Sequence, residues 1–403
     1  MFLFLFNQAC FTRQIQKPII EPEQYVSKDE IVIIDEVIID NEHAVKESND
    51  SIYPKILKNK YKIALALPFE LNAIYNENYK QSILSRISQD FYSGIKVFAD
   101  EFNHLGNTPE IEIVVYDIAA YDSIGPTFLN ILKQNQIDIL IGPFSKEHLS
   151  QLKDFSIENK MTIFSPFQTD ETQLLKNPYF ISYKLSDNMI YELLSQHINE
   201  FYRSFNLVLI ASAMSDMDEF KEKLNKNGYQ GNFNGFVVNS SNWSNTAYLS
   251  TLKDSNNLII CLIEHDLVAI NSILTNFSSV SSKKFDLMVP YEWLYQNAIE
   301  TAILNTLNCR LFSEPNIDYS DSANFYFFSL YREKFKTEPS DYAFRAFKMM
   351  SLINDALLKE GKYIQRSFNS SSFFRRVENS AGFENADMHY YYFKENKLIR
   401  FIP

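Results

Sequence analysis

The sequence predicts an α/β protein with two doubly wound parallel-sheet lobes and a cleft between them. The first observation is length, because 403 residues with 46% hydrophobic content exceed what one compact lobe needs. The second is a repeated alternation of short apolar strands and amphipathic helices, which is typical of parallel sheets with right-handed crossovers. The third is a break in that alternation near residue 185, after which the pattern starts again.

A first series of elements begins at residue 61. The apolar run at 61–67 ends at Pro68 and predicts a buried strand. Phe91 and Phe98 belong to a stripe at helical spacing, with Gly94 on the same side, where a helix can approach a sheet closely. Ser145 precedes another helical stripe and is its expected N-cap. The remaining strands of this series are expected at 111–117, 137–141, 161–164 and 179–183, with a helix at 126–134.

A second series follows, and Asp187 is expected to cap its first helix. Apolar runs predict strands at 207–211, 235–238, 257–263 and 285–289, with helices between them. The last hundred residues differ from both series. They predict two helices at 322–336 and 341–360, the second ending at Gly361, and a closing hairpin formed by 388–393 and 398–402.

The N-terminus divides into a signal-like stub, residues 1–10, and an acidic tether, residues 11–60. The apolar stretch in the stub is too short to span a bilayer, but Cys10 follows Ala9 as an acylated cysteine follows a lipoprotein signal. Cys10 is therefore the expected lipidation site. No Lys or Arg precedes the stub, so an N-terminus without an anchor remains the alternative.

The tether is expected to be acidic and without helical order. Ten acidic residues and two lysines lie between residues 21 and 50, and they account for most of the net charge of −12. Two β-prone runs, at 31–34 and 37–39, are expected to add an edge strand to the body or to a partner. The body is near neutral and has no basic stripe, which argues against a nucleic-acid partner.

Several kinds of chemistry have no sequence signature here. The loop after the first strand, residues 68–72, has none of the glycines that a dinucleotide site needs, and there is no Walker A sequence. The six histidines are scattered, with no HExxH motif, and there is no GxSxG elbow. We therefore expect no enzyme, no cofactor and no metal site. Cys261 is expected to be a buried apolar residue, and a Cys261–Cys309 bridge stays open.

Local strings, in their order along the chain, resemble the type I periplasmic binding proteins. The strand ending in Leu67-Pro68-Phe69 and the later string at 90–94 are similar to the opening of that family. ILIGPFS at 139–145 and IFSPF at 163–167 are similar to its next two strands and cleft loops. A helix, a Thr-Glu-Pro-Ser turn and a long helix follow in family order between residues 328 and 358. The resemblance covers about 61–403 and is nearest to the branch found in Bacteroidetes envelope lipoproteins.

The resemblance implies three chain crossings between the lobes, expected near 184–187, 289–292 and 366–384. Lobe one would then be 61–184 plus 292–368, and lobe two 185–291 plus 369–403. It also implies a ligand site between the carboxyl ends of the two sheets. The residues implied to bind ligand are, in lobe one, Phe69, Ser145, Phe167, Gln168 and Thr169, and in lobe two, Ser215, Asp216, Tyr291 and Glu292.

In this scheme Ser145 and the loop containing Thr169 would bind a ligand carboxylate, and Asp216 or Glu292 would face an ammonium group. The implied function is capture of a small polar, amino-acid-like solute in the periplasm or cell envelope. The expected partners are that solute and a permease or envelope protein, with membrane contact only through a lipid anchor.

Two alternatives stay open. One is a scaffold of the same fold that binds no solute and docks a cell-wall or secretion partner. It is favoured by Ala346-Phe347-Lys348, which stands where relatives have Gly-Tyr-Asp on the long helix and implies an altered cleft. The other is a hydrolase with paired carboxylates, because spatial pairs are invisible in a sequence.

Overall fold

A computed structural model of the chain describes residues from Tyr53 onward, with gaps. The described ranges are 53–73, 80–104, 109–121, 123–167, 176–280, 282–314, 322–369, 371, 373–376, 381–394 and 397–401. The expectations for Cys10, for the β-prone runs at 31–39, and for Gln168 and Thr169 fall outside these residues.

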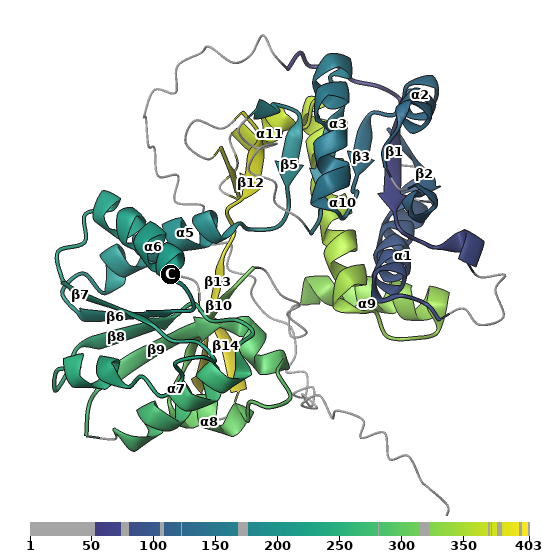
Figure 1. Ribbon diagram of the computed structural model, residues 1–403. Coiled ribbons are helices and arrows are strands. Elements are labelled where there is room, and N and C mark those ends of the chain that lie inside the picture. Colours follow the sequence, from purple (N-terminus) through teal and green to yellow (C-terminus); the bar gives the residue numbers. More distant parts are fainter. Residues whose placement is uncertain are drawn as a thin grey trace, which may run out of the picture. The chain divides into compact units, whose positions relative to one another are not determined.

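The first lobe contains a seven-stranded sheet (Figure 1). Its order is β2-β1-β3-β4-β5-β12-β11, and every neighbouring pair is parallel except β11 and β12. Helices α1 and α10 pack on one face of this sheet, and α2 and α3 pack on the other. The strands are β1 (Lys60–Leu67), β2 (Glu110–Asp117), β3 (Ile139–Ile141), β4 (Thr162–Ser165), β5 (Phe180–Ser182), β11 (Phe374–Arg375) and β12 (Phe383–Asn385); the helices are α1 (Ile83–His104), α2 (Pro126–Gln134), α3 (Lys146–Asn159), α9 (Ser322–Phe335), α10 (Asp341–Glu360) and α11 (Gln365–Asn369).

The second lobe repeats this plan around another seven-stranded sheet. Its order is β7-β6-β8-β9-β10-β13-β14, parallel as far as β10 and antiparallel from there on. The predicted class, two doubly wound lobes, is therefore confirmed. The strands are β6 (Asn206–Ala211), β7 (Asn232–Val237), β8 (Asn257–Cys261), β9 (Phe285–Pro290), β10 (Arg310–Ser313), β13 (His389–Lys394) and β14 (Lys397–Phe401); the helices are α5 (Asp187–Phe201), α6 (Met214–Lys226), α7 (Leu267–Ser279) and α8 (Thr301–Thr306).

Two of the three expected crossings are wrong. The chain stays in the second lobe through β10 and leaves it after Ser313, rather than near 289–292. It stays in the first lobe through β11 and β12 and leaves it after Asn385, rather than within 366–384. The reason is that β10, β11 and β12 are only four, two and three residues long, too short to show an apolar period. The first crossing lies between β5 and α5.

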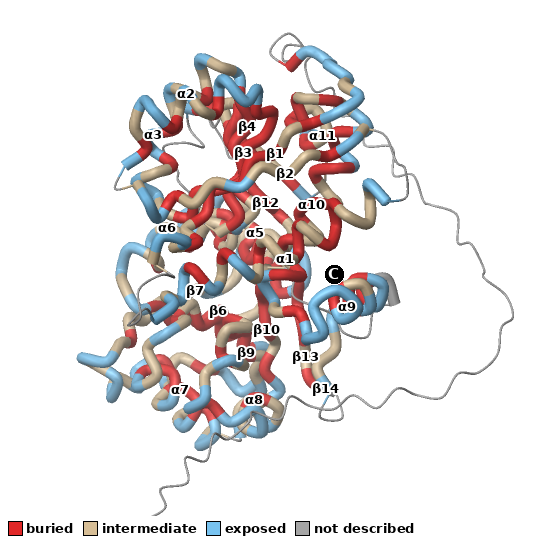
Figure 2. Tube along the Cα trace, turned by 90° about the vertical axis from the view of Figure 1, so that its right-hand side faces the viewer, coloured by how far each residue is buried: buried red, intermediate tan, exposed pale blue. Residues whose placement is uncertain are grey.

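The apolar core of the first lobe depends on a close contact between α1 and α10. A Cβ atom on Gly94 would lie 1.9 Å from the carbonyl oxygen of Ala343, so only glycine permits this approach. The close approach expected for Gly94 is therefore real, but its partner is a helix rather than the sheet. Figure 2 shows the buried residues concentrated in the strands and along α10, with exposed positions on α9.

The tether ends earlier than residue 60. Tyr53 is fully buried, and its hydroxyl donates to the carbonyl of Pro178 at 2.7 Å. Ile56 forms a parallel bridge with Gly361, and Lys58 pairs with the buried Asp138 at 2.5 Å. These contacts make residues 53–58 a strap that packs against the first lobe, because an apolar ring and backbone hydrogen bonds offset the cost of ordering.

Three local predictions can be compared with the structure. The cap of α5 is Ser186, whose side chain accepts from Met189 N–H, and Asp187 is the first helical residue. Cys261 and Cys309 are both buried and free, so the bridge left open is absent. The predicted closing hairpin is confirmed as β13 and β14.

Candidate functional site

The carboxyl ends of β3 and β4 lie next to each other in the first sheet and position the first-lobe candidates. β3 runs into Gly142-Pro143-Phe144, and Ser145 then caps α3 by accepting from His148 N–H at 3.1 Å. Phe167 follows β4 two residues after Ser165. Because parallel strands end at the same edge of a sheet, these two loops meet beside the point where strand order reverses.

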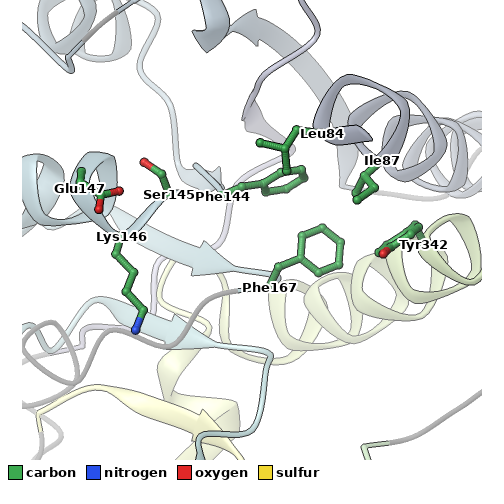
Figure 3. A pocket seen from close by; sticks show the side chains of 8 residues that line it. All are labelled: Leu84, Ile87, Phe144, Ser145, Lys146, Glu147, Phe167 and Tyr342. Atoms are coloured by element: carbon green, nitrogen blue, oxygen red, sulfur yellow. The ribbon is translucent and has the colours of Figure 1, made fainter. Parts of the chain in front are cut away.

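A pocket of about 490 Å³ lies at this edge (Figure 3). Leu84 and Ile87 of α1, Phe144, Phe167 and Tyr342 of α10 form its apolar walls, and Ser145, Lys146 and Glu147 form its polar side. Ring centroids of Phe144 and Phe167 are 4.8 Å apart, and those of Phe167 and Tyr342 are 5.5 Å apart. The pocket is within the size range of small-molecule sites and suits an apolar group beside a few polar atoms.

Of the expected first-lobe residues, Ser145 and Phe167 line this pocket. Phe69 does not line it, because its ring is buried in the lobe core, 6.1 Å from Tyr92. The backbone N–H of Phe69 donates to Oδ1 of Asp117 at 2.9 Å, which fixes the loop after β1.

In the second lobe, three carboxylates follow three neighbouring strands. Glu264 comes after β8, Glu292 after β9 and Glu314 after β10, and we call them the carboxylate row. Burial, with the negative charges of Glu264 and Glu314, raises the pKa of Glu292 to about 7. Burial raises the pKa of Glu264 as well. Neighbouring carboxylates favour a cationic group. Arg345 of α10 already pairs with Glu314, so Glu264 and Glu292 are the members of the row available to a ligand cation.

The other second-lobe candidates differ from one another. Tyr291 precedes Glu292 in a short 3-10 helix, and its ring lies 4.9 Å from that of Tyr391. Ser215 and Asp216 are in the first turn of α6, where Asp216 accepts from Ser212 at 3.3 Å. Ser215 is exposed, and neither of these two residues lines the pocket.

Sequence reasoning missed most of the pocket wall. Leu84 and Ile87 continue the helical stripe of Phe91 toward the N-terminus, so that stripe could have revealed them. Tyr342 and the carboxylates Glu264 and Glu314 gave no signal, because their positions depend on which strands are neighbours.

The departure on the long helix falls at the edge of the core, since Phe347 and Lys348 are half-buried. Ala346 is fully buried. Phe347 packs between Phe327 and Phe98, with ring centroids 4.7 Å and 5.6 Å from its own. None of the residues 346–348 lines the pocket. Ala346 and Phe347 therefore contribute to helix packing in the first lobe rather than to the pocket.

Solved structures of transport proteins have this fold. A putative branched-chain amino acid ABC transporter protein from Rhodospirillum rubrum matches with a TM-score of 0.61 at 10% identity, over 84% of this chain and 98% of that one. A periplasmic ligand-binding protein of a branched-chain amino acid ABC transporter from Burkholderia xenovorans matches with a TM-score of 0.55 at 11% identity, over 83% and 91%. An ABC transporter substrate-binding protein from Desulfitobacterium hafniense, in complex with Leu, matches with a TM-score of 0.52 at 15% identity, over 85% and 100%.

These likenesses define the class: the chain has the fold of type I periplasmic binding proteins. No protein-family model and no curated protein matches the sequence. Among the described residues, no helix is long and apolar enough to cross a membrane, and no cluster of His, Cys, Asp and Glu is arranged to hold a metal ion.

Proposed function

We propose that this protein is an extracytoplasmic solute-binding protein that captures a small amino-acid-like ligand between its lobes. One observation carries the proposal. The two sheets share the same order through their parallel strands, and their carboxyl edges carry complementary chemistry: an aromatic pocket with a hydroxyl on the first and the carboxylate row on the second. An apolar amino acid matches both edges: its side chain and carboxylate suit the aromatic pocket and the hydroxyl, and its ammonium group suits the carboxylate row.

Each proposed role follows from the chemistry of the side chain. The Ser145 oxygen already accepts from His148 N–H, which leaves its own hydrogen to donate to a ligand carboxylate. Phe144 and Phe167 would cover the apolar group. Glu292 would pair with the ammonium, and Tyr291 would border it. Gln168 and Thr169 are retained as carboxylate ligands from the loop after β4, and Ser215 and Asp216 as second-lobe contacts.

The setting is part of the same proposal. We place the protein in the periplasm or cell envelope, anchored through Cys10, among the lipoproteins of the Bacteroidetes branch that its local strings resemble. A permease or another envelope protein would receive the solute. The scaffold alternative has less support, because none of the residues 346–348 that suggested it lines the pocket.

Calorimetric titration with a panel of amino acids, aromatic acids and sugars tests the proposal. We expect an apolar or aromatic amino acid to bind, and Phe167→Ala to weaken it about 10- to 100-fold through lost apolar contact. Phe325→Ala is the matched control, since Phe325 is 51% exposed on α9 of the same lobe and does not line the pocket. If no member of the panel binds, or if both variants weaken binding equally, the proposed site is wrong.

A further inference from the structure

The first chain crossing is held by hydrogen bonds from the other two. Leu185 N–H donates to Oε1 of Glu314 at 2.6 Å, and the next amide, Ser186 N–H, donates to Oε1 of Glu384 at 2.5 Å. Glu314 lies directly after β10 at the second crossing, and Glu384 lies in β12, directly before the third. Two consecutive amides of one crossing are therefore bound by carboxylates from two different crossings.

Glu314 has a second partner, on the first lobe. Its Oε2 accepts from the guanidinium of Arg345 in α10 at 2.6 Å. The side chains of Glu314 and Arg345 are only 17% and 26% exposed, so the ion pair is poorly screened by solvent. Because Glu314 continues β10 and Arg345 belongs to α10, this bond links an element of each lobe.

Glu314 also influences the proposed ligand site. Glu314 is a member of the carboxylate row, and its negative charge contributes, after burial and Glu264, to the raised pKa of Glu292. A change in the hydrogen bonds of Glu314 would therefore change the electrostatic potential at the Glu292 carboxyl group. This places one side chain at both the hinge and the row.

We infer that Glu314 is a positioning residue that clamps the hinge by holding the Leu185 amide and the Arg345 guanidinium together. Hinge motion between lobes is absorbed by dihedral changes in the crossing segments. A rotation that separates Leu185 from Arg345 must break one of the two bonds of Glu314. The clamp therefore narrows the range of hinge angles in the ligand-free protein. Its part in ligand capture rests on the proposed function, whereas the restriction itself needs no ligand.

Amide hydrogen exchange measured residue by residue on the ligand-free full chain tests the clamp. In Glu314→Gln, we expect the Leu185 amide to exchange about 10- to 100-fold faster, since it loses a charge-assisted acceptor, while Ser186 keeps Glu384 and changes little. In Glu384→Gln, we expect the Ser186 amide to exchange faster and the Leu185 amide to change little. Glu264→Gln is the matched control, because Glu264 belongs to the same row and bonds neither amide.

A distance measurement tests the hinge itself. Spin labels on Asp154→Cys in α3 and Glu222→Cys in α6, both exposed, report the separation of the lobes in a background of Cys10→Ser. We expect a narrow distribution in the otherwise unchanged chain and in Glu264→Gln, and a broader one in Glu314→Gln. If Glu314→Gln destabilises the fold, the double variant Glu314→Gln with Arg345→Met removes both charges and should broaden the distribution in the same way. If the distance distribution of Glu314→Gln is unchanged, the inference is wrong even if the Leu185 amide exchanges faster. If the exchange rate of the Leu185 amide is unchanged, the inference is wrong as well. Failure to find a ligand leaves both results valid.

Discussion

At the residue scale, the carboxyl group of Glu292 gives a prediction that needs no ligand. Its pKa is raised from 4.5 to about 7, chiefly by burial and then by Glu264 and Glu314. Between these pH values the folded chain keeps a proton on Glu292 that the unfolded chain has lost. The free energy of unfolding therefore falls as pH rises from about 4.5 to about 7, and this group has no further effect above that.

Glu292→Gln removes this dependence. Urea unfolding at pH 5 and pH 8 measures the free energy of unfolding at each pH. We expect the loss of this free energy from pH 5 to pH 8 to be about 1–3 kcal/mol smaller in the variant than in the unchanged protein. Glu222→Gln, at an exposed position of α6, makes the same chemical change as a control. If both variants respond to pH in the same way, Glu292 is not held in its neutral form.

Single residues also show what the sequence could and could not reveal. Ser145 was predictable, because an N-cap before an apolar stripe is a local pattern and the structure confirms it. Glu264 and Glu314 were not predictable, because each becomes part of the carboxylate row only when β8, β9 and β10 become neighbours. The burial of Phe69 in the lobe core was not predictable, since an aromatic residue after a strand looks the same in a sequence whether it faces a ligand or the core.

At the scale of elements, Gly361 reports on the strap formed by residues 53–58. Gly361 ends α10 with φ of +79°, and a Cβ atom there would lie 2.1 Å from the carbonyl oxygen of Ile56. Gly228 has the same φ of +79° but no atom within 4 Å of its Cβ position. Both glycines have a positive φ, but Gly361 also has ψ of −151°, a conformation essentially restricted to glycine, and only Gly361 contacts the strap.

We expect Gly361→Ala to lower the free energy of unfolding by about 3 kcal/mol or more, because the strap must move as well. Gly228→Ala should cost about 1 kcal/mol, the cost of a left-handed residue alone. Denaturant unfolding of the two variants measures the difference. Equal losses would contradict both the glycine-only conformation of Gly361 and the packing of residues 53–58 against it.

Elements also explain why the lobe boundaries were mispredicted. The long strands and helices were visible in the sequence, since their apolar periods extend over many residues. Strands β11 and β12 have two and three residues, and they join a sheet formed by chain some two hundred residues earlier. Which sheet a short strand joins is a tertiary choice, and no local pattern encodes it.

At the scale of the whole molecule, the two sheets have the same strand order and different carboxyl edges. The first edge bears an aromatic pocket of about 490 Å³, and the second bears the carboxylate row. The fold class followed from the alternation of strands and helices. The difference between the edges did not, because it arises from loops whose neighbours only the structure reveals.

The most direct test of this account is a crystal structure of the protein crystallised with the tightest-binding member of the ligand panel. We expect one small molecule with its apolar group between Phe144 and Phe167, its carboxylate near Ser145 and its amino group bound by a member of the carboxylate row. A cleft closed by protein side chains, or a ligand that touches neither the aromatic pocket nor the row, would contradict the proposed function.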